Sequence, residues 1–239
     1  MRLRRLRFTA AEIAETLGMA LSTVSGILTR IGMGRLGLIG LEQPLRYERA
    51  RSGELVHIDV KKLGRIAGAG HRMTGDRKSQ NVRFHRRRRG ELGWEFVHVA
   101  VDDYSRLAYA EVLADEKAAT AAGFLERAIT FYRRYGIEVE RVLTDNGSCY
   151  RATRHALTCH RLGIRHLRTR PYRPQTNDKA ERFIHTLLNG WAYAAIYASS
   201  HERTRAPDGW LWHYNHRRRH SALSHQPPVT RTNLLGSYS

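Results

Sequence analysis

The sequence predicts a mixed α/β protein, a sheet with helices on its faces, preceded by a small all-α unit. Two observations lead to this prediction. From residue 55 onward, strand-like alternation and helical periodicity follow one another in the order strand, strand, strand, helix, strand, helix, strand, helix. Before residue 45 the apolar residues keep helical spacing alone, and a glycine-rich stretch follows them. We therefore expect two units, residues 1–45 with their linker and residues 50–232.

The composition favours a polyanionic partner. The 239-residue chain carries 41 Lys and Arg against 22 Asp and Glu, a formal net charge of +19, and its 41% of hydrophobic residues suffices for a packed core. Such a surplus favours nucleic acid first and an anionic membrane second. No apolar run approaches the ~20 residues that span a bilayer, and the basic N-terminus lacks the apolar region of a secretory signal. We expect a cytoplasmic protein with no membrane partner, in which Cys149 and Cys159 are reduced packing thiols.

The first unit has the pattern of a helix-turn-helix. Thr9 and Glu12 have the spacing of a capping box, Gly18 ends the first helix, and Ser22 is expected to cap the second. Flanking arginines favour DNA binding over the alternative, a plain helical hairpin. In the second helix the residues expected to face inward are Val24, Ile27 and Leu28. Its outer, DNA-facing surface should consist of Ser22, Ser25, Gly26, Thr29 and Arg30.

The second unit opens with a strand around "LVHIDVKKL", which carries Asp59 in its middle. A carboxylate at such a position is costly to bury unless it is paired or bound to a cation. A basic insertion follows in residues 61–92, with eleven Lys and Arg against two acidic residues, and it includes Arg86, Arg87, Arg88 and Arg89. A loop this basic is suited to phosphate contacts. Two strands in "WEFVHVAVDDYSRLAYAEVL" come next, with Asp102 in their turn as a secondary candidate for a metal neighbour.

The remaining elements place two more acids. A helix over residues 117–135 precedes the strand that ends at Asp145, where Asn146 and Gly147 favour a turn. A helix over residues 150–162 and the short strand "GIRHLRT" follow. The segment "RPYRPQTN" cannot be regular, because its prolines lack the backbone donor. After it, a long helix is predicted to run from near residue 177 toward residue 198, with Glu181 one turn inside it.

Each acid alone has an ordinary explanation. Asp59 could lie on an exposed strand face, Asp145 could serve the turn, and Glu181 could be a surface acid of its helix. Together the three carboxylates form a set that would repel one another without a cation, on a chain that is otherwise strongly basic. Carboxylate oxygens are the ligands that Mg²⁺ prefers. If the fold brings all three together, they suit a metal ion held against nucleic acid.

The three acids also resemble a known pattern. An Asp on the first strand, an Asp in "TDNG" and a Glu in "PQTNDKAERFIHTLL" with 35 residues between the last two are similar to the D,D-35-E pattern of insertion-sequence transposases with a retroviral-integrase-like core. The likeness extends through "VDDYSRLAYAEVL" and "LGIRHLRTRPYRPQTN" to "WLWHYNHRRRHSALSHQPPVTR", and so covers residues 50–232. It departs at Asp178, where a small residue is common, and relatives usually carry more helix-turn-helix sequence before the core.

The resemblance implies a ribonuclease-H-like fold and metal-dependent cleavage and strand transfer of DNA, with Asp59, Asp145 and Glu181 as the catalytic and metal-binding acids. It implies Mg²⁺ or Mn²⁺, two ions roughly 4 Å apart when DNA is bound, and a homo-oligomer assembled on element ends and target DNA, in a prokaryotic nucleoid. Two alternatives stay open: a non-catalytic helix-turn-helix regulator with a relict core, and a ribonuclease-H-like nuclease that does not join strands. Further DNA contacts are expected from Tyr172, Arg173, Lys179 and Arg182. The core is expected to end in a basic C-terminal tail, whose run from His216 to His220 faces DNA or solvent.

Overall fold

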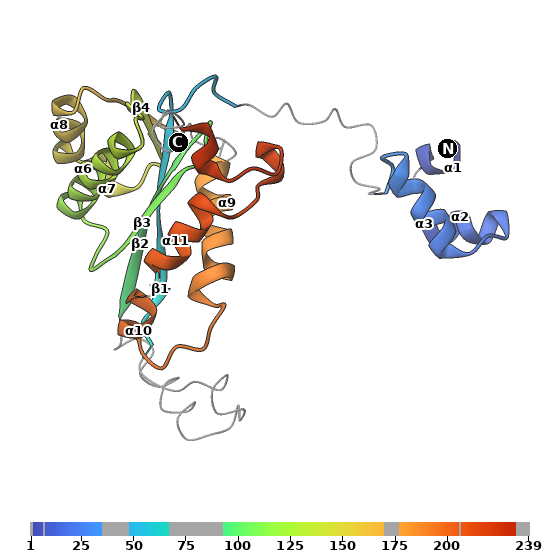
Figure 1. Ribbon diagram of the computed structural model, residues 1–239. Coiled ribbons are helices and arrows are strands. Elements are labelled where there is room, and N and C mark those ends of the chain that lie inside the picture. Colours follow the sequence, from blue (N-terminus) through green and yellow to red (C-terminus); the bar gives the residue numbers. More distant parts are fainter. Residues whose placement is uncertain are drawn as a thin grey trace. The chain divides into compact units, whose positions relative to one another are not determined.

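The computed structural model describes residues 2–6, 8–34, 48–66, 93–169, 177–205 and 207–232. The chain divides into two compact units, Met1–Tyr47 and Glu48–Ser239 (Figure 1). The first unit contains the helices α1 (Arg2–Arg5), α2 (Ala10–Leu17) and α3 (Leu21–Arg30).

Local sequence signals set the limits of α2. The Thr9 hydroxyl accepts from the Glu12 amide at 3.2 Å, and the Glu12 carboxylate accepts from the Thr9 amide at 2.6 Å, which completes the predicted capping box. The helix ends at Gly18, whose φ of 62° is the left-handed conformation that glycine adopts without strain. The two longer helices share a small core made of Ile13, Ala14, Val24 and Leu28.

Two details of α3 differ from the sequence prediction. The residue that caps this helix is Ala20, in an extended conformation, so Ser22 lies inside the first turn and is not the cap. Ile27 is 38% exposed and does not face inward as predicted, because the contact with α2 uses only the narrow stripe of Val24 and Leu28. The outer face of α3 is exposed along its length.

The second unit is built on a five-stranded sheet in the order β3-β2-β1-β4-β5. Its strands are β1 (Val56–Gly64), β2 (Trp94–Asp102), β3 (Ala108–Leu113), β4 (Arg141–Thr144) and β5 (Arg165–Arg168). The first three strands are antiparallel neighbours, whereas β4 pairs in parallel with both β1 and β5. The order of strands and helices along the chain agrees with the prediction.

Helices cover both faces of this sheet (Figure 1). On the first face lie α6 (Ala118–Arg134), α7 (Ser148–Arg151) and α8 (Thr153–Arg161), and their apolar residues pack with Val56 and Ile58 of β1. On the second face lie α9 (Asp178–Leu187) and α11 (Pro207–His216), which pack with Leu63 of β1 and with β2 and β3. Because side chains alternate along a strand, His57 and Asp59 point to the second face, the face of α9.

Two helices predicted in the second unit are shorter than expected. The helix predicted over residues 150–162 is interrupted at Ala152, which is extended (φ −68°, ψ 142°) and separates α7 from α8. The helix predicted to run toward residue 198 ends as α9 at Leu187 and continues only as a wider turn over Leu188–Ala192.

The C-terminal region predicted as a basic tail is partly a structural element of the core. After α10 (Ser200–Arg205), α11 buries Leu211 and Tyr214 in the second core. The Asn215 side chain accepts from the Ala108 amide at 2.9 Å and donates to the Ala108 carbonyl at 2.8 Å. It thereby pairs with the edge strand β3 in the manner of a further strand. The basic residues Arg217–Arg219 that follow are exposed.

Candidate active site

The pairing of β1 with β4 brings two of the predicted acids to the same level of the sheet. Val56 is the partner of Val142, and His57 is the partner of Leu143. Two residues further along both chains, Asp59 on β1 is level with Asp145, the first residue after β4. Side chains alternate between the two faces along a strand, and both residues stand at positions that point to the second face. The two carboxylates are therefore directed toward the side covered by α9.

The turn after β4 holds Asp145 at the exposed end of the strand. Its Oδ1 accepts from the Gly147 amide at 2.8 Å, which closes the predicted turn. A Cβ atom on residue 147 would lie 2.9 Å from that same oxygen, so a larger residue here would displace the Asp145 carboxylate. The Asn146 amide donates to the Thr169 carbonyl at 2.9 Å and joins the turn to the end of β5.

Glu181 comes from α9, which packs on the sheet through Ala180, Phe183, Ile184 and Leu187. The start of this helix is fixed on β1 by Asn177, whose Nδ2 donates to the Ile58 carbonyl at 3.4 Å and whose Oδ1 lies 3.2 Å from His57 Nδ1. Glu181 follows Asn177 by one helical turn and is exposed. It therefore extends from the helix at the level of β1 that carries Asp59.

The three acids act on one another electrostatically. The pKa of Asp59 is raised to about 6, first by burial and then by the charges of Asp145 and Glu181, while the Val60 amide and Lys61 oppose the rise. A carboxylate held near other negative charges binds a proton or a cation readily, because either relieves the repulsion. The three carboxylates, one half-buried and two exposed, offer the oxygen donors that Mg²⁺ and Mn²⁺ prefer. Among the described residues, the ligand atoms that already lie close enough together for a metal ion are those of His155, Cys159 and His166.

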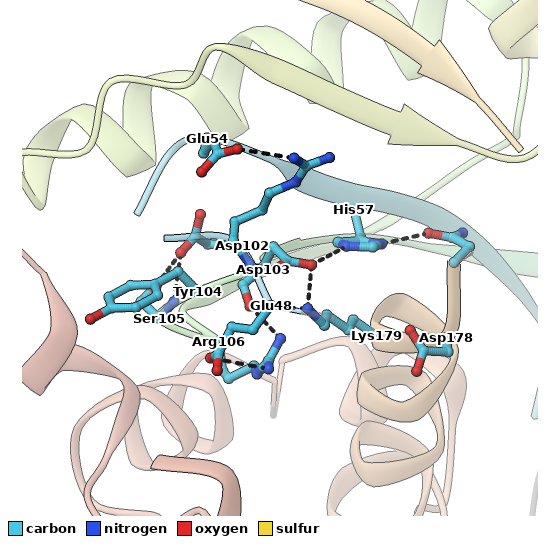
Figure 2. Close-up of polar contacts among 12 residues, drawn as sticks. Glu48, Glu54, His57, Asp102, Asp103, Tyr104, Ser105, Arg106, Asp178 and Lys179 are labelled. Atoms are coloured by element: carbon cyan, nitrogen blue, oxygen red, sulfur yellow. Dashed lines mark hydrogen bonds and ion pairs between the residues drawn. The ribbon is translucent and has the colours of Figure 1, made fainter. Parts of the chain in front are cut away.

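A buried polar network is centred on Asp103, directly after β2, and joins it to β1 and α9 (Figure 2). The Asp103 carboxylate, 1% exposed, accepts from the Arg49 amide at 2.7 Å, lies 2.8 Å from His57 Nε2 and is paired with the Lys179 ammonium. Burial alone would raise the pKa of Asp103, but hydrogen bonds from His57, Lys179 and the Arg49 amide outweigh it and hold the pKa well below its usual range. The network therefore contains a stable buried carboxylate ion.

This network corrects two sequence predictions. Lys179 was predicted to contact DNA, but its side chain is only 12% exposed and its ammonium is bound by Asp103. Asp102 was a secondary candidate for a metal neighbour, but it is fully buried and accepts from the Gly53 amide, the Ser105 amide and the Ser105 hydroxyl at 2.6–2.8 Å. Arg182, in contrast, is 76% exposed beyond its 3.6 Å contact with Asp178 and remains available to a phosphate.

The other predicted DNA contacts fall into two groups. Four of them, Ser22, Ser25, Thr29 and Arg30, are exposed on α3. Six lie outside the residues that the structure describes: Arg86, Arg87, Arg88, Arg89, Tyr172 and Arg173. The sequence had indicated neither Asp103 nor Asn177 as a site residue. One sequence feature could have pointed to Asp103, namely the pair of adjacent aspartates directly after an apolar strand. Carboxylates at such a position are often buried and then require hydrogen-bond donors.

Behind β4, on the first face, a second group of polar side chains is packed into the core. His155, Cys159 and His166 each place a nitrogen or sulfur atom within 4.8 Å of the others. His166 Nε2 lies 2.9 Å from the Thr144 hydroxyl, directly before Asp145. Burial, and then the proximity of His166, lower the pKa of His155 to about 4. The group therefore packs at the end of β4, with two neutral imidazoles beside a free, buried thiol.

Across the described parts of the chain, no helix has the length and apolarity required to cross a bilayer.

Two stretches of the chain match the integrase core domain family, residues 49–174 and residues 162–228. An uncharacterized protein of insertion element IS136 from Agrobacterium fabrum is 33% identical over 86 residues, 36% of this chain and 44% of that protein. Transposase InsD of the IS2 insertion elements of Escherichia coli is 35% identical over 88 residues, 36% of this chain and 29% of that protein. The chain thus spans less than half the length of these curated relatives.

Solved structures share the architecture of the second unit. The catalytic core domain of BIV integrase superposes with a TM-score of 0.50 at 22% identity, over 74% of this chain and 92% of that one. The HTLV-2 integrase catalytic core domain, solved in complex with magnesium, gives 0.52 at 15% identity, over 76% and 97%. These likenesses confirm the predicted ribonuclease-H-like fold, a mixed five-stranded sheet with helices on its faces.

Proposed function

Because this chain belongs to the integrase core domain family, we propose that it is the transposase of an insertion sequence, which cuts DNA at the element ends and joins them to a target. One observation carries the proposal. Asp59, Asp145 and Glu181 come from three separate elements, face the same side of the sheet and act electrostatically on one another. Insertion-sequence proteins among the sequence relatives support the same conclusion.

The three carboxylates would hold the divalent cations of the reaction, Mg²⁺ or Mn²⁺. Bound there, such ions supply a lowered pKa for the attacking hydroxyl and neutralise charge on the phosphate. The half-buried Asp59 would orient this assembly from the sheet, while the exposed Asp145 and Glu181 lie where a DNA backbone could approach. In the reaction, a hydroxyl oxygen bonds to the phosphorus and the bond to the 3′ oxygen breaks in line with it. Water as the attacking group gives cleavage, and a DNA 3′ hydroxyl gives strand transfer.

DNA binding is divided between the two units in this proposal. The exposed face of α3, with Ser22, Ser25, Thr29 and Arg30, would read base sequence at the element ends. The basic residues of the second unit, Arg182 among them, would contact phosphates without sequence preference. Such a protein works on chromosomal DNA, as an assembly of several copies that brings two ends together.

The two alternative functions, a nuclease and a regulator, would leave the DNA in different states. A ribonuclease-H-like nuclease would cut the DNA and leave it unjoined, and a regulator with a relict core would bind it unchanged. The complete acid set argues against the regulator, because burial and the charges of Asp145 and Glu181 make the ionised form of Asp59 costly when no cation is bound.

A strand-transfer assay tests the proposal. Purified full-length chain is incubated with Mg²⁺ or Mn²⁺, labelled terminal-repeat DNA of its own element and a supercoiled target plasmid. The proposal expects cleaved ends and joined products that both require the metal. Cut ends without joined products would favour the nuclease, and retained binding without cutting would favour the regulator.

A further inference from the structure

The Asp103 carboxylate joins three segments of the second unit. Its donors are the Arg49 amide before β1, His57 at the start of β1 and Lys179 in the first turn of α9 (Figure 2). The backbone takes part as well, because the Asp103 amide donates to the Leu55 carbonyl at 2.8 Å. Asp103 itself directly follows β2. A single buried anion thus connects β2, β1 and the start of α9.

Two donors of this anion each precede one of the proposed acids by two residues in the sequence, one on the sheet and one on the helix. His57 precedes Asp59 by two residues and points to the same face of β1. Lys179 precedes Glu181 by two residues on α9, and Asn177, one turn before Glu181, lies against His57 Nδ1 at 3.2 Å. The chain of contacts therefore runs from the strand position beside Asp59 to the helical turn that carries Glu181.

We infer that Asp103, with His57 and Lys179, is a positioning residue that fixes the first turn of α9 on β1 and so holds Glu181 at a set position relative to Asp59. The network touches no reacting atom in this assignment and acts through the two acids. Because the inference concerns the geometry of the proposed metal site, it rests on the proposed function. The effect of the network on α9 can nevertheless be measured without metal or DNA.

A contribution to the stability of the fold does not by itself explain why this ion pair is buried here. Buried ion pairs are often no more stabilising than apolar residues of the same volume, because removing both charges from water is costly. The rest of α9 is already fixed by the apolar contacts of Phe183, Ile184 and Leu187. The ion pair acts instead at the N-terminal end of the helix, where the first backbone amides have no partner within the helix. Directional bonds to a buried anion fix both position and rotation there, which apolar contacts do less well.

Asp102 offers a matched control within the same turn. It is fully buried like Asp103, but its donors come from Gly53 and Ser105. Asp102→Asn and Asp103→Asn therefore both disturb a buried, hydrogen-bonded carboxylate, and only Asp103→Asn removes the partner of α9. Lys179→Met provides a second test from the other side of the pair.

The first measurement is amide hydrogen exchange in the metal-free full-length protein. The amides of Arg182, Phe183 and Ile184 report on the first turn of α9, because in an α-helix they bond to carbonyls four residues earlier. Their rates are divided by those of α6 amides on the opposite face, which corrects for any loss of global stability. Asp103→Asn and Lys179→Met should raise this ratio at least tenfold, and Asp102→Asn should change it less than threefold. An unchanged ratio in Asp103→Asn, or equal changes in both aspartate variants, would overturn the assignment.

The second measurement is the affinity for Mn²⁺, followed by calorimetry on the same proteins. Asp103→Asn should weaken Mn²⁺ binding at least tenfold and Asp102→Asn less than threefold, and Asp103→Glu should recover part of the loss. Equal affinities in the two Asn variants would contradict the positioning role. Failure of the unaltered protein to bind Mn²⁺ would instead contradict the proposed function, and the exchange ratio would still decide what Asp103 does.

Discussion

Asp59 is the acid whose surroundings differ from those of the other two, because it is half-buried in the sheet while Asp145 and Glu181 are exposed. Its pKa of about 6, against an ordinary 3.8, means that the folded state binds a proton there more tightly than the unfolded chain does. Without metal, stability should therefore fall as the pH rises from about 4 to about 6. A cation bound by the three acids would remove this penalty.

Replacing each of the three acids by its amide removes the negative charge and keeps the shape of the side chain. Asp59→Asn, Asp145→Asn and Glu181→Gln should each abolish cleavage and joining while leaving DNA binding nearly unchanged, because each removes a metal-binding charge and keeps the side-chain size. Asp59→Asn should also raise the free energy of unfolding at pH 7 without metal by about 1–3 kcal/mol. Strand-transfer assays and metal-free denaturant titrations measure the two effects. A variant with near-normal cleavage would remove that residue from the catalytic set.

His155 gives a second pH dependence, of opposite sign. Its pKa is lowered from 6.5 to about 4 by burial and by His166, so the unfolded chain binds the proton more tightly. Stability should be intact above about pH 6.5 and fall as the pH drops toward about 4, by at most about 1.4 kcal/mol per pH unit from this residue. In His155→Phe that part of the slope should be absent. Urea titrations at several pH values measure it, and an unaltered slope would show that His155 has the same pKa in the folded and unfolded states.

At the scale of elements, the entry into β1 depends on one glycine. Gly53 has a φ of 85°, and a Cβ atom there would collide with the Glu138 carbonyl. Its carbonyl also accepts from the Glu140 amide at 2.8 Å, and its amide donates to Asp102. Gly53→Ala should destabilise the protein by about 2–4 kcal/mol, from backbone strain and overpacking together. Gly64→Ala, where nothing lies within 4 Å of the added carbon, is the control and should stay within about 1 kcal/mol. Denaturant midpoints compare the two.

Elements with strong local signals were predictable from sequence, and those fixed by packing were not. Thr9, Glu12 and Gly18 specify the limits of α2 through their own side chains and backbone freedom. The break at Ala152 and the early end of α9 at Leu187 have no such local signal, since alanine and leucine both favour helix. The acids Asp59, Asp145 and Glu181 were identifiable by their spacing. Asp103 was not, because its role depends on Lys179 and His57, which are distant from it in sequence.

At the scale of the whole molecule, the two compact units suggest two separable kinds of DNA binding. Removal of residues 1–45 should leave both cores of the second unit intact, because the described residues of those cores begin at Val56. The shortened protein should lose its preference for the element ends and keep salt-sensitive binding to any duplex. Competition binding with end and random duplexes measures this. The same preference before and after truncation would place sequence reading in the second unit.

The net charge of +19 makes salt dependence the most direct test of where DNA runs on the molecule. Each phosphate contact contributes about −0.9 to the slope of log K against log salt concentration. Arg86, Arg87, Arg88 and Arg89 form the densest basic run of the 61–92 insertion, so replacing all four with Ala should flatten the slope by roughly two to four units. All duplexes should weaken about equally, because phosphates carry no sequence information. The exposed run Arg217–Arg219 after α11 is the matched comparison. If its replacement flattens the slope and that of Arg86–Arg89 does not, DNA passes along the C-terminal side of the core.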